Sequence, residues 1–518
     1  MAGCRPSEGP ANRYLRRVLI TLCLVLGTLA GCDSQPQQYL RDEQGRALVL
    51  HGLNVTGSAK DDPRRLPWIE QADAERLSRD WGFNLARFLI FWDAVEPEPG
   101  VYDDTYLEAV AERIRWLREA GVYVVLDMHQ DVWGKRDQSG QAIGFDGAPD
   151  WAGRSDGLIH RPVEPWALNY FQPTVVRLFD NFWNDQGPHS DLQQHYAAMW
   201  KHIAERFRDE PAVLGYNLMN EPSAGRAVYG DLNGVVVGNY QRAYDFAVGR
   251  YLRFHQRMIS AIREVDPDGW IFFEPLAFPA NNGGPSYLPP ISDVRTGPPR
   301  IAYFPHIYPL EAEARGAYLP SDRKVIRDWA RERDKEARAQ GSPMLIGELG
   351  IVNGAGGDPL GFLQDMLDMA DRHTSGWACW AYDRGGGFSV LDGDGNENSQ
   401  FEVMVRPYAR RISGAPKRTD YDASRRVLYV EFSDDGEASG PTEIYLPARR
   451  LFPDGWRLHV SDAAGSWSSA WNEESETLLV TTPKAGRKRH ILIVTPPMDC
   501  DLFSDDCGTA GFSMRTAG

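Results

Sequence analysis

The chain has 518 residues, of which 42% are hydrophobic and 25% are charged, so it is long enough for a large barrel with an added domain. A net charge of -16 and a pI of about 5.2 argue against a nucleic-acid-binding protein, which needs a basic face. The 16 Trp, 21 Tyr and 21 Phe residues are compatible with surfaces on which sugar rings stack, although large cores also use aromatic side chains.

The first 31 residues have the pattern of an export signal. Several arginines precede an apolar run from Val18 to Leu29, which is too short to span a bilayer comfortably. The run ends in LAGC, which resembles the lipobox of bacterial lipoproteins, in which the cysteine is lipidated and becomes the first mature residue. An ordinary secretory signal that is cut nearby is the alternative. Both patterns predict an exported protein, and the lipobox predicts anchoring through Cys32 to a bacterial membrane, with a linker over residues 32–44.

Eight short apolar, β-branched runs follow, and helix-like segments such as residues 105–120 and 195–210 lie between most of them. Such runs are typical of parallel strands that are buried on both faces. In chain order they cover residues 47–54, 83–90, 122–129, 212–219, 270–275, 300–308, 343–350 and 376–383. Eight strand–helix units predict a (β/α)₈ TIM barrel over residues 45–414. A doubly wound sheet is the alternative, but no glycine-rich phosphate-binding fingerprint follows the first strand.

The pattern changes near residue 410. Short strand-like runs (VLYVEF, TEIYLP, WRLHVS, TLLVTT and HILIVT) are separated by Gly, Pro, Asp and Ser, without a long helix between them. They predict a small C-terminal antiparallel β-sandwich over residues 415–496, and residues 497–518 would form a tail. A carbohydrate-binding module and a structural or lipid-docking domain are both open for the sandwich. Trp456, Trp467 and Trp471 would either pack in its core or stand exposed.

Three cysteines remain after the signal segment. Cys379 lies in an apolar strand-like run, where we expect a buried free thiol. Cys500 and Cys507 flank DLFSDD near the C-terminus, and whether they close this small loop as a disulfide is left open. No histidine or cysteine cluster has the spacing of metal ligands, so we expect neither a metal nor a cofactor.

Polar residues end the apolar runs. Because the active site of a (β/α)₈ barrel lies at the carboxyl ends of its strands, we expect these side chains to form one ring. They are Asn54, Arg87, His129 with Asp131, Asn220 with Glu221, Glu274, His306 with Tyr308, Glu348, and Trp380 with Asp383.

Glu221 and Glu348 offer the two carboxyl groups that a glycosidase needs. Hydrolysis of a glycosidic bond requires one carboxyl group to protonate the leaving oxygen and another to attack carbon or to activate water. The two glutamates would end the fourth and seventh strands, on roughly opposite sides of the barrel mouth. A separation of about 5 Å would indicate retention through a covalent intermediate.

The sequence Asn220-Glu221-Pro222 after a strand, together with IGELG around Glu348, resembles glycoside hydrolase family 5, a retaining (β/α)₈ family. The resemblance spans residues 45–400. It implies that Glu221 is the general acid/base and that Glu348 is the nucleophile. It also implies substrate-binding roles for the other residues that match family positions, which are Arg87, His129, Asn220, His306, Tyr308 and Trp380.

Longer stretches resemble the endoglycoceramidase branch of that family: WDAVEPEPGVYDD, LDMHQDVW, ERFRDEPAVLGYNLMNEP and VRPYARRISGAP. Members of this branch have a barrel and a C-terminal β-sandwich, and they cut the β-bond between the glycan and the ceramide of glycosphingolipids. Related members act on galactosylceramide-type lipids or steryl glucosides. The resemblance therefore implies a glycolipid substrate and contact with a membrane surface. Residues 134–157 and 275–287 depart from the branch and would reshape its subsites.

The physical roles agree with this resemblance. Arg87 would favour the ionised form of Glu348, which must attack, and the charge of Glu348 would keep Glu221 protonated until the glycosyl-enzyme forms. Tyr308 would hydrogen-bond Glu348. We expect Asn220 to bind the sugar 2-OH. The remaining expected subsite contacts are the ring face of Trp380 and the carboxylate of Asp131.

Each of these residues also has a structural explanation when it is taken singly. Arg87 would be an ion-pair partner, His129 and His306 satisfied core histidines, and Trp380 barrel packing. We expect Glu274 to be structural or peripheral, because the other two glutamates fill both catalytic roles.

Two rival functions stay open. One is a family 5 hydrolase of β-glucan or mannan, which an apolar pocket beside the sugar site would oppose. The other is a lipoprotein that binds glycans without cleaving them, which has no reason to keep the pair Glu221 and Glu348.

Overall fold

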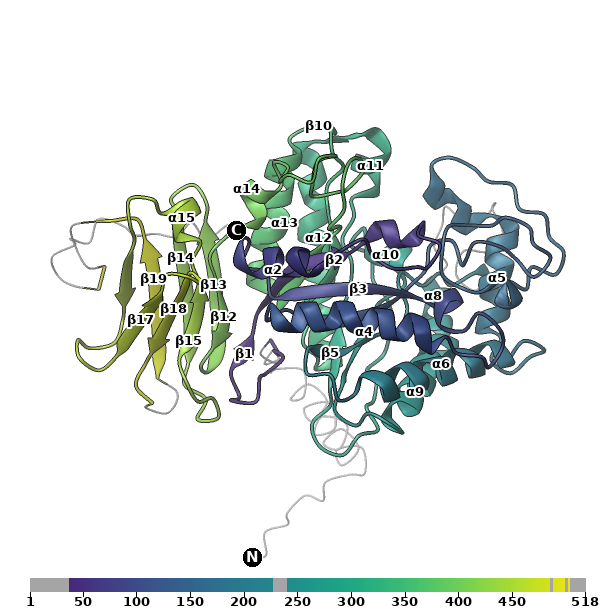
Figure 1. Ribbon diagram of the computed structural model, residues 1–518, viewed down its shortest axis with the longest axis horizontal. Helices are drawn as coiled ribbons and strands as arrows, with labels where there is room; N and C mark the ends of the chain where they lie inside the picture. Colours follow the sequence, from purple (N-terminus) through teal and green to yellow (C-terminus); the bar gives the residue numbers. More distant parts are fainter. Residues whose placement is uncertain (1–36, 227–239, 485–487, 499–501, 504–518) are drawn as a thin grey trace, which may run out of the picture. The chain divides into compact units, whose positions relative to one another are not determined.

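The computed structural model describes residues 37–226, 240–484, 488–498 and 502–503 (Figure 1). Its eight-stranded parallel sheet confirms the expected barrel, with the strand order β7-β6-β5-β4-β3-β2-β11-β9. The strands are β2 (Leu50–Val55), β3 (Leu85–Phe91), β4 (Tyr123–His129), β5 (Val213–Asn217), β6 (Trp270–Phe273), β7 (Ile301–Tyr303), β9 (Ile346–Leu349) and β11 (Gly376–Cys379). The N–H groups of Leu345 and Ile307 donate to the carbonyls of Tyr303 and Glu348, at 2.9 and 3.0 Å, which joins β7 to the β9 segment and closes the barrel.

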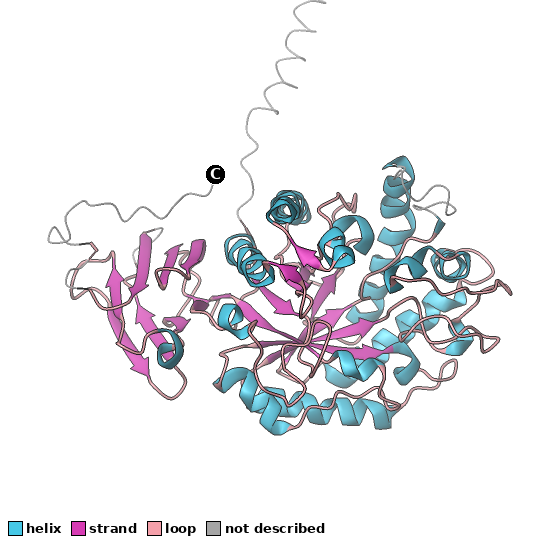
Figure 2. Ribbon diagram, turned by 90° about the horizontal axis from the view of Figure 1, so that it is seen from above, coloured by secondary structure: helices cyan, strands magenta, loops and turns pink. Residues whose placement is uncertain are grey.

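Helices surround these strands, which converge on a common centre in Figure 2. The longer helices are α2 (Gln71–Arg79), α4 (Asp104–Glu119), α5 (Pro173–Trp183), α6 (Asp191–Phe207), α9 (Leu252–Arg263), α12 (Arg323–Gln340) and α13 (Pro359–His373). In α4 the buried residues Leu107, Val110, Ile114 and Leu117 recur at helical spacing, so one face packs inward. The Asp103 carboxylate caps its first turn by accepting two backbone N–H bonds of 2.9 Å.

Short helical segments in the connections carry several pocket residues. These helical segments are η1 (Gly57–Lys60), α3 (Trp92–Val95), η2 (Asp150–Ala152), η3 (Trp166–Phe171), α8 (Tyr240–Phe246), η4 (Ala247–Tyr251), α10 (Ala277–Ala280), α11 (Leu310–Arg315), η5 (Pro320–Asp322), α14 (Phe401–Met404) and α15 (Ala448–Leu451). Two short parallel strands, β8 (Ala317–Tyr318) and β10 (Gly356–Gly357), pair in the same region as α11. No helix among the described residues has the length and apolar character needed to cross a membrane.

Fully buried apolar side chains pack together inside the barrel. They are Leu50, Leu85, Val125, Phe272, Ala302, Phe304, Leu345 and Ala378, and they form one core cluster with Leu40 and Leu48. The guanidinium carbon of Arg87 lies 5.8 Å from the centre of the Phe304 ring. The polar ring at the strand ends therefore begins directly on this apolar layer, which fixes the strands and excludes water from below the site.

The C-terminal region contains two antiparallel sheets, with the orders β1-β12-β15-β18-β17 and β13-β14-β19-β16. Their strands are β1 (Ala47–Leu48), β12 (Tyr408–Ile412), β13 (Ala415–Asp422), β14 (Val427–Ser433), β15 (Thr442–Tyr445), β16 (Arg457–Val460), β17 (Ser468–Asn472), β18 (Thr477–Thr481) and β19 (Arg489–Thr495). The five strand-like runs in the sequence are thus confirmed as strands. Trp456, Trp467 and Trp471 are partly buried against the core, and the rings of Trp456 and Trp471 pack on each other with centroids 5.2 Å apart.

Some strands were not expected from the sequence, because charged or small polar residues interrupt their apolar pattern. β12 pairs with β15, although it precedes residue 415, where we expect the sandwich to begin. The run 47–54 divides into β1, which pairs with β12, and β2, which belongs to the barrel. Cys379 is a buried free thiol, as expected. Cys32, Cys500 and Cys507 lie outside the described residues, as do residues 1–31 and most of the tail.

Candidate active site

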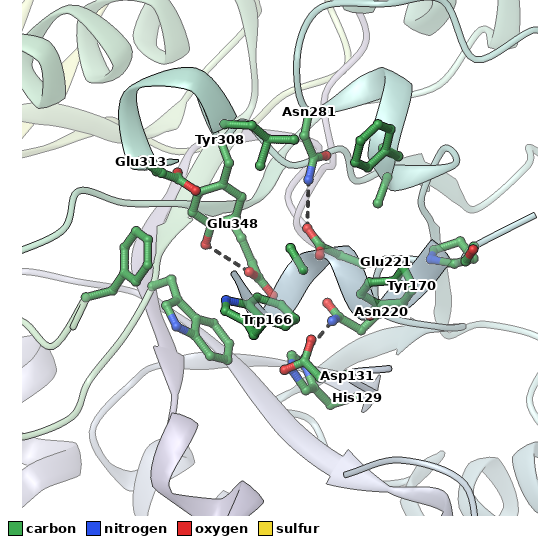
Figure 3. Close-up of a pocket in the computed structure, with 18 of the residues that line it drawn as sticks. His129, Asp131, Trp166, Tyr170, Asn220, Glu221, Asn281, Tyr308, Glu313 and Glu348 are labelled. Atoms are coloured by element: carbon green, nitrogen blue, oxygen red, sulfur yellow. Dashed lines mark hydrogen bonds and ion pairs between the residues drawn. The ribbon is translucent and has the colours of Figure 1, made fainter. Parts of the chain in front are cut away.

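The structure gathers the predicted site residues at the carboxyl ends of the barrel strands (Figure 3). Most of them line one pocket: His129, Asp131, Asn220, Glu221, Tyr308, Glu348 and Trp380. Arg87 and His306 are buried directly behind the two glutamates, which they contact.

Glu348, on β9, is held by two hydrogen-bond donors. Arg87 Nη1 donates to Oε1 at 2.5 Å, and the Tyr308 hydroxyl donates to Oε2 at 2.9 Å. Burial raises the pKa of this carboxyl group above that of an exposed glutamate, and the positive charges of His306 and Arg87 oppose this shift. The two donors therefore fix both oxygens and favour the charged form that a nucleophile needs.

Glu221 follows β5 in the left-handed backbone region, with φ of 40°. Its Oε1 accepts from Asn281 Nδ2 at 2.8 Å and lies 3.0 Å from His306 Nδ1 (Figure 3 shows the first contact). One carboxylate oxygen of Glu221, one of Glu348 and a ring nitrogen of His306 all lie within 4.8 Å of one another. The separation of the two carboxylates, which sequence cannot give, is thus short.

His306 is surrounded by carboxylates. Burial lowers its pKa, but the charges of Glu274 and Glu348 outweigh burial, together with the bond to Glu221, and raise the pKa to about 10. His306 is therefore an imidazolium at neutral pH, and its Nδ1–H donates to Glu221.

His129 and Asp131 form a second polar cluster with Trp380. His129 Nδ1 bonds to Asp127 at 2.7 Å, and its ring stacks on Trp380 with centroids 5.3 Å apart. The Lys60 ammonium contacts Asp131 and lies 4.3 Å from the centre of the Trp380 ring. Burial and Lys60 lower the pKa of His129, but Asp127 outweighs them and the pKa rises to about 9. Trp380 therefore packs against His129 and Lys60 and also lines the pocket.

Asp146, from the 134–157 segment, is buried beside Asp131. Burial and the charge of Asp131 raise its pKa to about 7. This segment thus contributes a carboxyl group to the polar cluster, and its expected effect on the subsites stays a prediction.

Aromatic side chains form a wall on the Glu221 side of the pocket. Gln130 Nε2 donates to the Tyr170 hydroxyl at 3.3 Å and to the Glu221 carbonyl at 3.1 Å, so Tyr170 and Glu221 are neighbours. Phe171, on η3, packs edge-on against Phe278, on α10, with centroids 4.6 Å apart. Trp166, Tyr170, Phe171 and Phe278 all line the pocket, and we call these four residues the aromatic wall.

Several pocket residues were missed by the sequence analysis. Lys60 lies on η1, Asn281 follows α10, and Glu313 lies on α11, all in loops that begin at strand ends. Burial and the charge of Glu221 raise the pKa of Glu313 to about 7. The only sequence signal for these residues is their position in such loops. Glu274, which we expected to be structural or peripheral, contacts Arg87 and the Glu221 backbone and is therefore not peripheral.

Two groups of described side chains lie close enough together to share a metal ion: His129 with Asp131 and Asp146, and His306 with Glu221 and Glu348. A protein cation contacts one carboxylate in each group. Lys60 contacts Asp131, and the imidazolium of His306 contacts Glu221. The expectation of a metal-free site stays a prediction.

Comparison with known proteins agrees with this geometry. The family model "Cellulase (glycosyl hydrolase family 5)" matches residues 42–386, and the model "Glycoside hydrolase family 5 C-terminal domain" matches residues 406–494. The chain is 28% identical to "Endoglycoceramidase I" of Rhodococcus hoagii (strain 103S), over 82% of this chain and 81% of that protein.

Solved structures of Endo-glycoceramidase II from Rhodococcus sp. are also similar to this chain. The ganglioside GM3 complex is 35% identical with a TM-score of 0.78, and the lactosyl-enzyme intermediate is 36% identical with a TM-score of 0.77. Each alignment covers 89% of this chain and 100% of that one. With family models over most of both domains, the chain belongs to glycoside hydrolase family 5.

Proposed function

We propose that this protein is a retaining endo-β-glycosidase that hydrolyses the bond between the glycan and the ceramide of glycosphingolipids. The short separation of Glu221 and Glu348, with oxygens within 4.8 Å, carries the retaining chemistry of the proposal. Retaining glycosidases hold their carboxyl groups about 5–5.5 Å apart, whereas inverting enzymes need about 6.5–9.5 Å to admit a water. The similarity to a protein solved with ganglioside GM3 and as a lactosyl-enzyme supports both the substrate and the double displacement.

In the first step the Glu348 carboxylate attacks the anomeric carbon while Glu221 gives its proton to the glycosidic oxygen. The bond to ceramide breaks, ceramide leaves as an alcohol, and the glycan is esterified to Glu348. In the second step Glu221, now a carboxylate, takes a proton from water, whose oxygen attacks the anomeric carbon and releases Glu348. Two inversions give net retention. Arg87 and Tyr308 hold the nucleophile throughout.

The glycan lies on the side of Trp380 and Lys60. Asn220 Oδ1 accepts from Arg87 at 2.7 Å, and its Nδ2 donates to the Gln130 carbonyl at 3.2 Å and lies 3.5 Å from His129 Nε2. The Asn220 side chain lines the pocket, where it would meet the sugar 2-OH. Trp380 offers a ring face to a pyranose, and Asp131 and Lys60 offer charged partners for hydroxyl groups.

The ceramide lies on the Glu221 side, because Glu221 protonates the leaving oxygen. The aromatic wall stands there, and an apolar wall beside the sugar site disfavours a hydrolase of plain polysaccharide, whose substrate is polar on both sides of the scissile bond. Two members of the wall stand partly in solvent, Trp166 (43% exposed) and Phe278 (39%), as do their neighbours Phe145 (46%) and Leu168 (44%). Such a rim suits contact with a lipid surface, from which the ceramide chains enter the pocket.

The catalytic pair makes the first prediction. Glu348→Gln removes the nucleophile and lowers kcat by about 10³-fold or more, and Glu221→Gln slows both covalent steps, without loss of the fold. The measurement is release of ceramide and intact glycan from a ganglioside, lactosylceramide, glucosylceramide and galactosylceramide, with a soluble β-glucan alongside. Glu43→Gln, at an exposed position, is the matched control and keeps wild-type activity.

We expect cleavage of glycolipids and none of the β-glucan. Cleavage of the β-glucan alone would overturn the proposed substrate while leaving the chemistry intact. Normal activity of Glu348→Gln, in a preparation free of wild-type enzyme, would overturn the chemistry as well.

The aromatic wall makes the second prediction. Phe278→Ala removes part of the apolar surface that a lipid chain contacts, so kcat/KM for a glycosphingolipid falls about 10-fold, the equivalent of burying a few methylene groups. The value for a soluble aryl lactoside stays within about twofold. Val294→Ala, which truncates another exposed apolar side chain, is the control. Equal losses on both substrates would show that Phe278 supports the fold and not the lipid.

We also propose that the protein is exported and anchored through lipid on Cys32 to a bacterial membrane. The support is the LAGC motif after a basic and apolar segment. Cys32→Ser, expressed in a bacterium that processes lipoproteins, moves the protein from the membrane fraction to the soluble fraction and abolishes incorporation of labelled fatty acid. Unchanged membrane association together with unchanged labelling would contradict the anchor.

A further inference from the structure

One buried carboxylate outside the catalytic pair touches three parts of the catalytic apparatus. Glu274 follows β6, and its side chain is almost entirely buried. Its Oε2 accepts the backbone N–H of Glu221 at 2.9 Å. Its Oε1 accepts from Arg87 Nη2 at 3.1 Å and lies 3.4 Å from His306 Nε2. The Tyr251 hydroxyl, on η4, donates to the Glu274 carbonyl at 2.7 Å and fixes the residue from the other side.

The bond from the Glu221 N–H matters because of the backbone at that position. Glu221 has φ of 40°, a backbone region that residues with a Cβ rarely occupy and in which they are strained. Such a conformation persists only when the surroundings determine it. Glu274 supplies a charged acceptor for that N–H, and charge-assisted bonds are stronger than neutral ones.

The contact between Glu274 and His306 affects the protonation state of both side chains. Burial disfavours the ionised form of Glu274, but His306 and Arg87 outweigh it and lower the pKa of this carboxyl group. The carboxylates that face His306 are Glu221, Glu274 and Glu348, while Arg87 lies beyond Glu274. Glu274 and Glu348 both favour the protonated form of His306, which donates its Nδ1–H to Glu221 Oε1.

We propose that Glu274 is a positioning residue for the acid/base: one carboxylate holds the backbone of Glu221 and, through the imidazolium of His306, keeps a charged N–H donor on the Glu221 side chain. This donor stabilises the carboxylate that Glu221 becomes when the leaving oxygen takes its proton. The inference rests on the proposed roles of Glu221 and Glu348 and assigns Glu274 a part in the same reaction. A purely structural ion pair with Arg87 is the competing explanation.

The test compares Glu274→Gln with wild type by two readouts. The first is the protonation of His306, followed by NMR of ¹⁵N-labelled histidine without substrate and assigned with His306→Gln. We expect His306 to stay protonated through pH 8 in the wild type and its pKa to fall by at least about one unit in the variant. This readout does not depend on the glycolipid, so it separates failure of the inference from failure of the proposed substrate.

The second readout is kcat/KM, which reports the steps up to the glycosyl-enzyme. An alkyl lactoside needs a proton on its leaving oxygen, whereas a 2,4-dinitrophenyl lactoside does not. We expect Glu274→Gln to lose about 10- to 100-fold on the former, part of the contribution of a general acid, and less than about threefold on the latter. Glu96→Gln is the matched control: Glu96 is also buried and bonded to a histidine, His195, but it does not line the pocket.

His306→Gln provides a second route if Glu274→Gln does not fold. It should show the same leaving-group dependence, and where both single variants fold, the double variant should lose little more than either one. Equal losses on the two lactosides, an unchanged His306 titration, or additive losses in the double variant would each overturn the proposal in favour of a structural ion pair.

Discussion

The buried guanidinium of Arg87 is the constraint on which the rest of the site depends. It lies on the apolar layer of the barrel interior and contacts side chains from five other strand ends: Asn54, Asp127, Asn217, Asn220, Glu274 and Glu348. A buried charge without such partners costs several kcal/mol, so the ring of acceptors and the cation require each other. Because these six acceptors come from five different strands, closing the barrel is also what assembles the catalytic geometry.

Glu221 and Glu348 lie close together, but their carboxyl groups have different hydrogen-bond and charge partners. Glu348 is placed between Arg87 and the Tyr308 hydroxyl, which stabilise a carboxylate. Glu221 lies at the pocket surface with Asn281 and His306 on its carboxyl group. Different surroundings for two neighbouring carboxyl groups are the usual physical basis for separate nucleophile and acid/base roles. The aromatic wall continues this division outward, since it stands on the side where the leaving group departs.

Sequence was informative where the signal is local. Apolar runs predicted all eight barrel strands, and the polar residue at the end of each run predicted most of the ring, including Arg87, Glu221 and Glu348. It failed where a role depends on contacts between distant elements. Glu274 looked redundant beside the two catalytic glutamates, because nothing local shows that its carboxylate reaches the Glu221 backbone. Lys60 and Glu313 lie in loops whose course is set by tertiary packing. In the sandwich, β12 and β17 carry charged or small residues and become strands only because partners pair with them.

The covalent step is the central claim, and trapping it is the most direct test. The enzyme would be treated with an activated 2-deoxy-2-fluoro-lactoside, which forms the glycosyl-enzyme faster than water removes it, and then digested and mapped by mass spectrometry. We expect one added deoxyfluorolactosyl group on the peptide that contains Glu348, and this group should be lost slowly on incubation. A label on another residue, or steady turnover of the wild-type enzyme on lactosides without any labelled peptide, would contradict it.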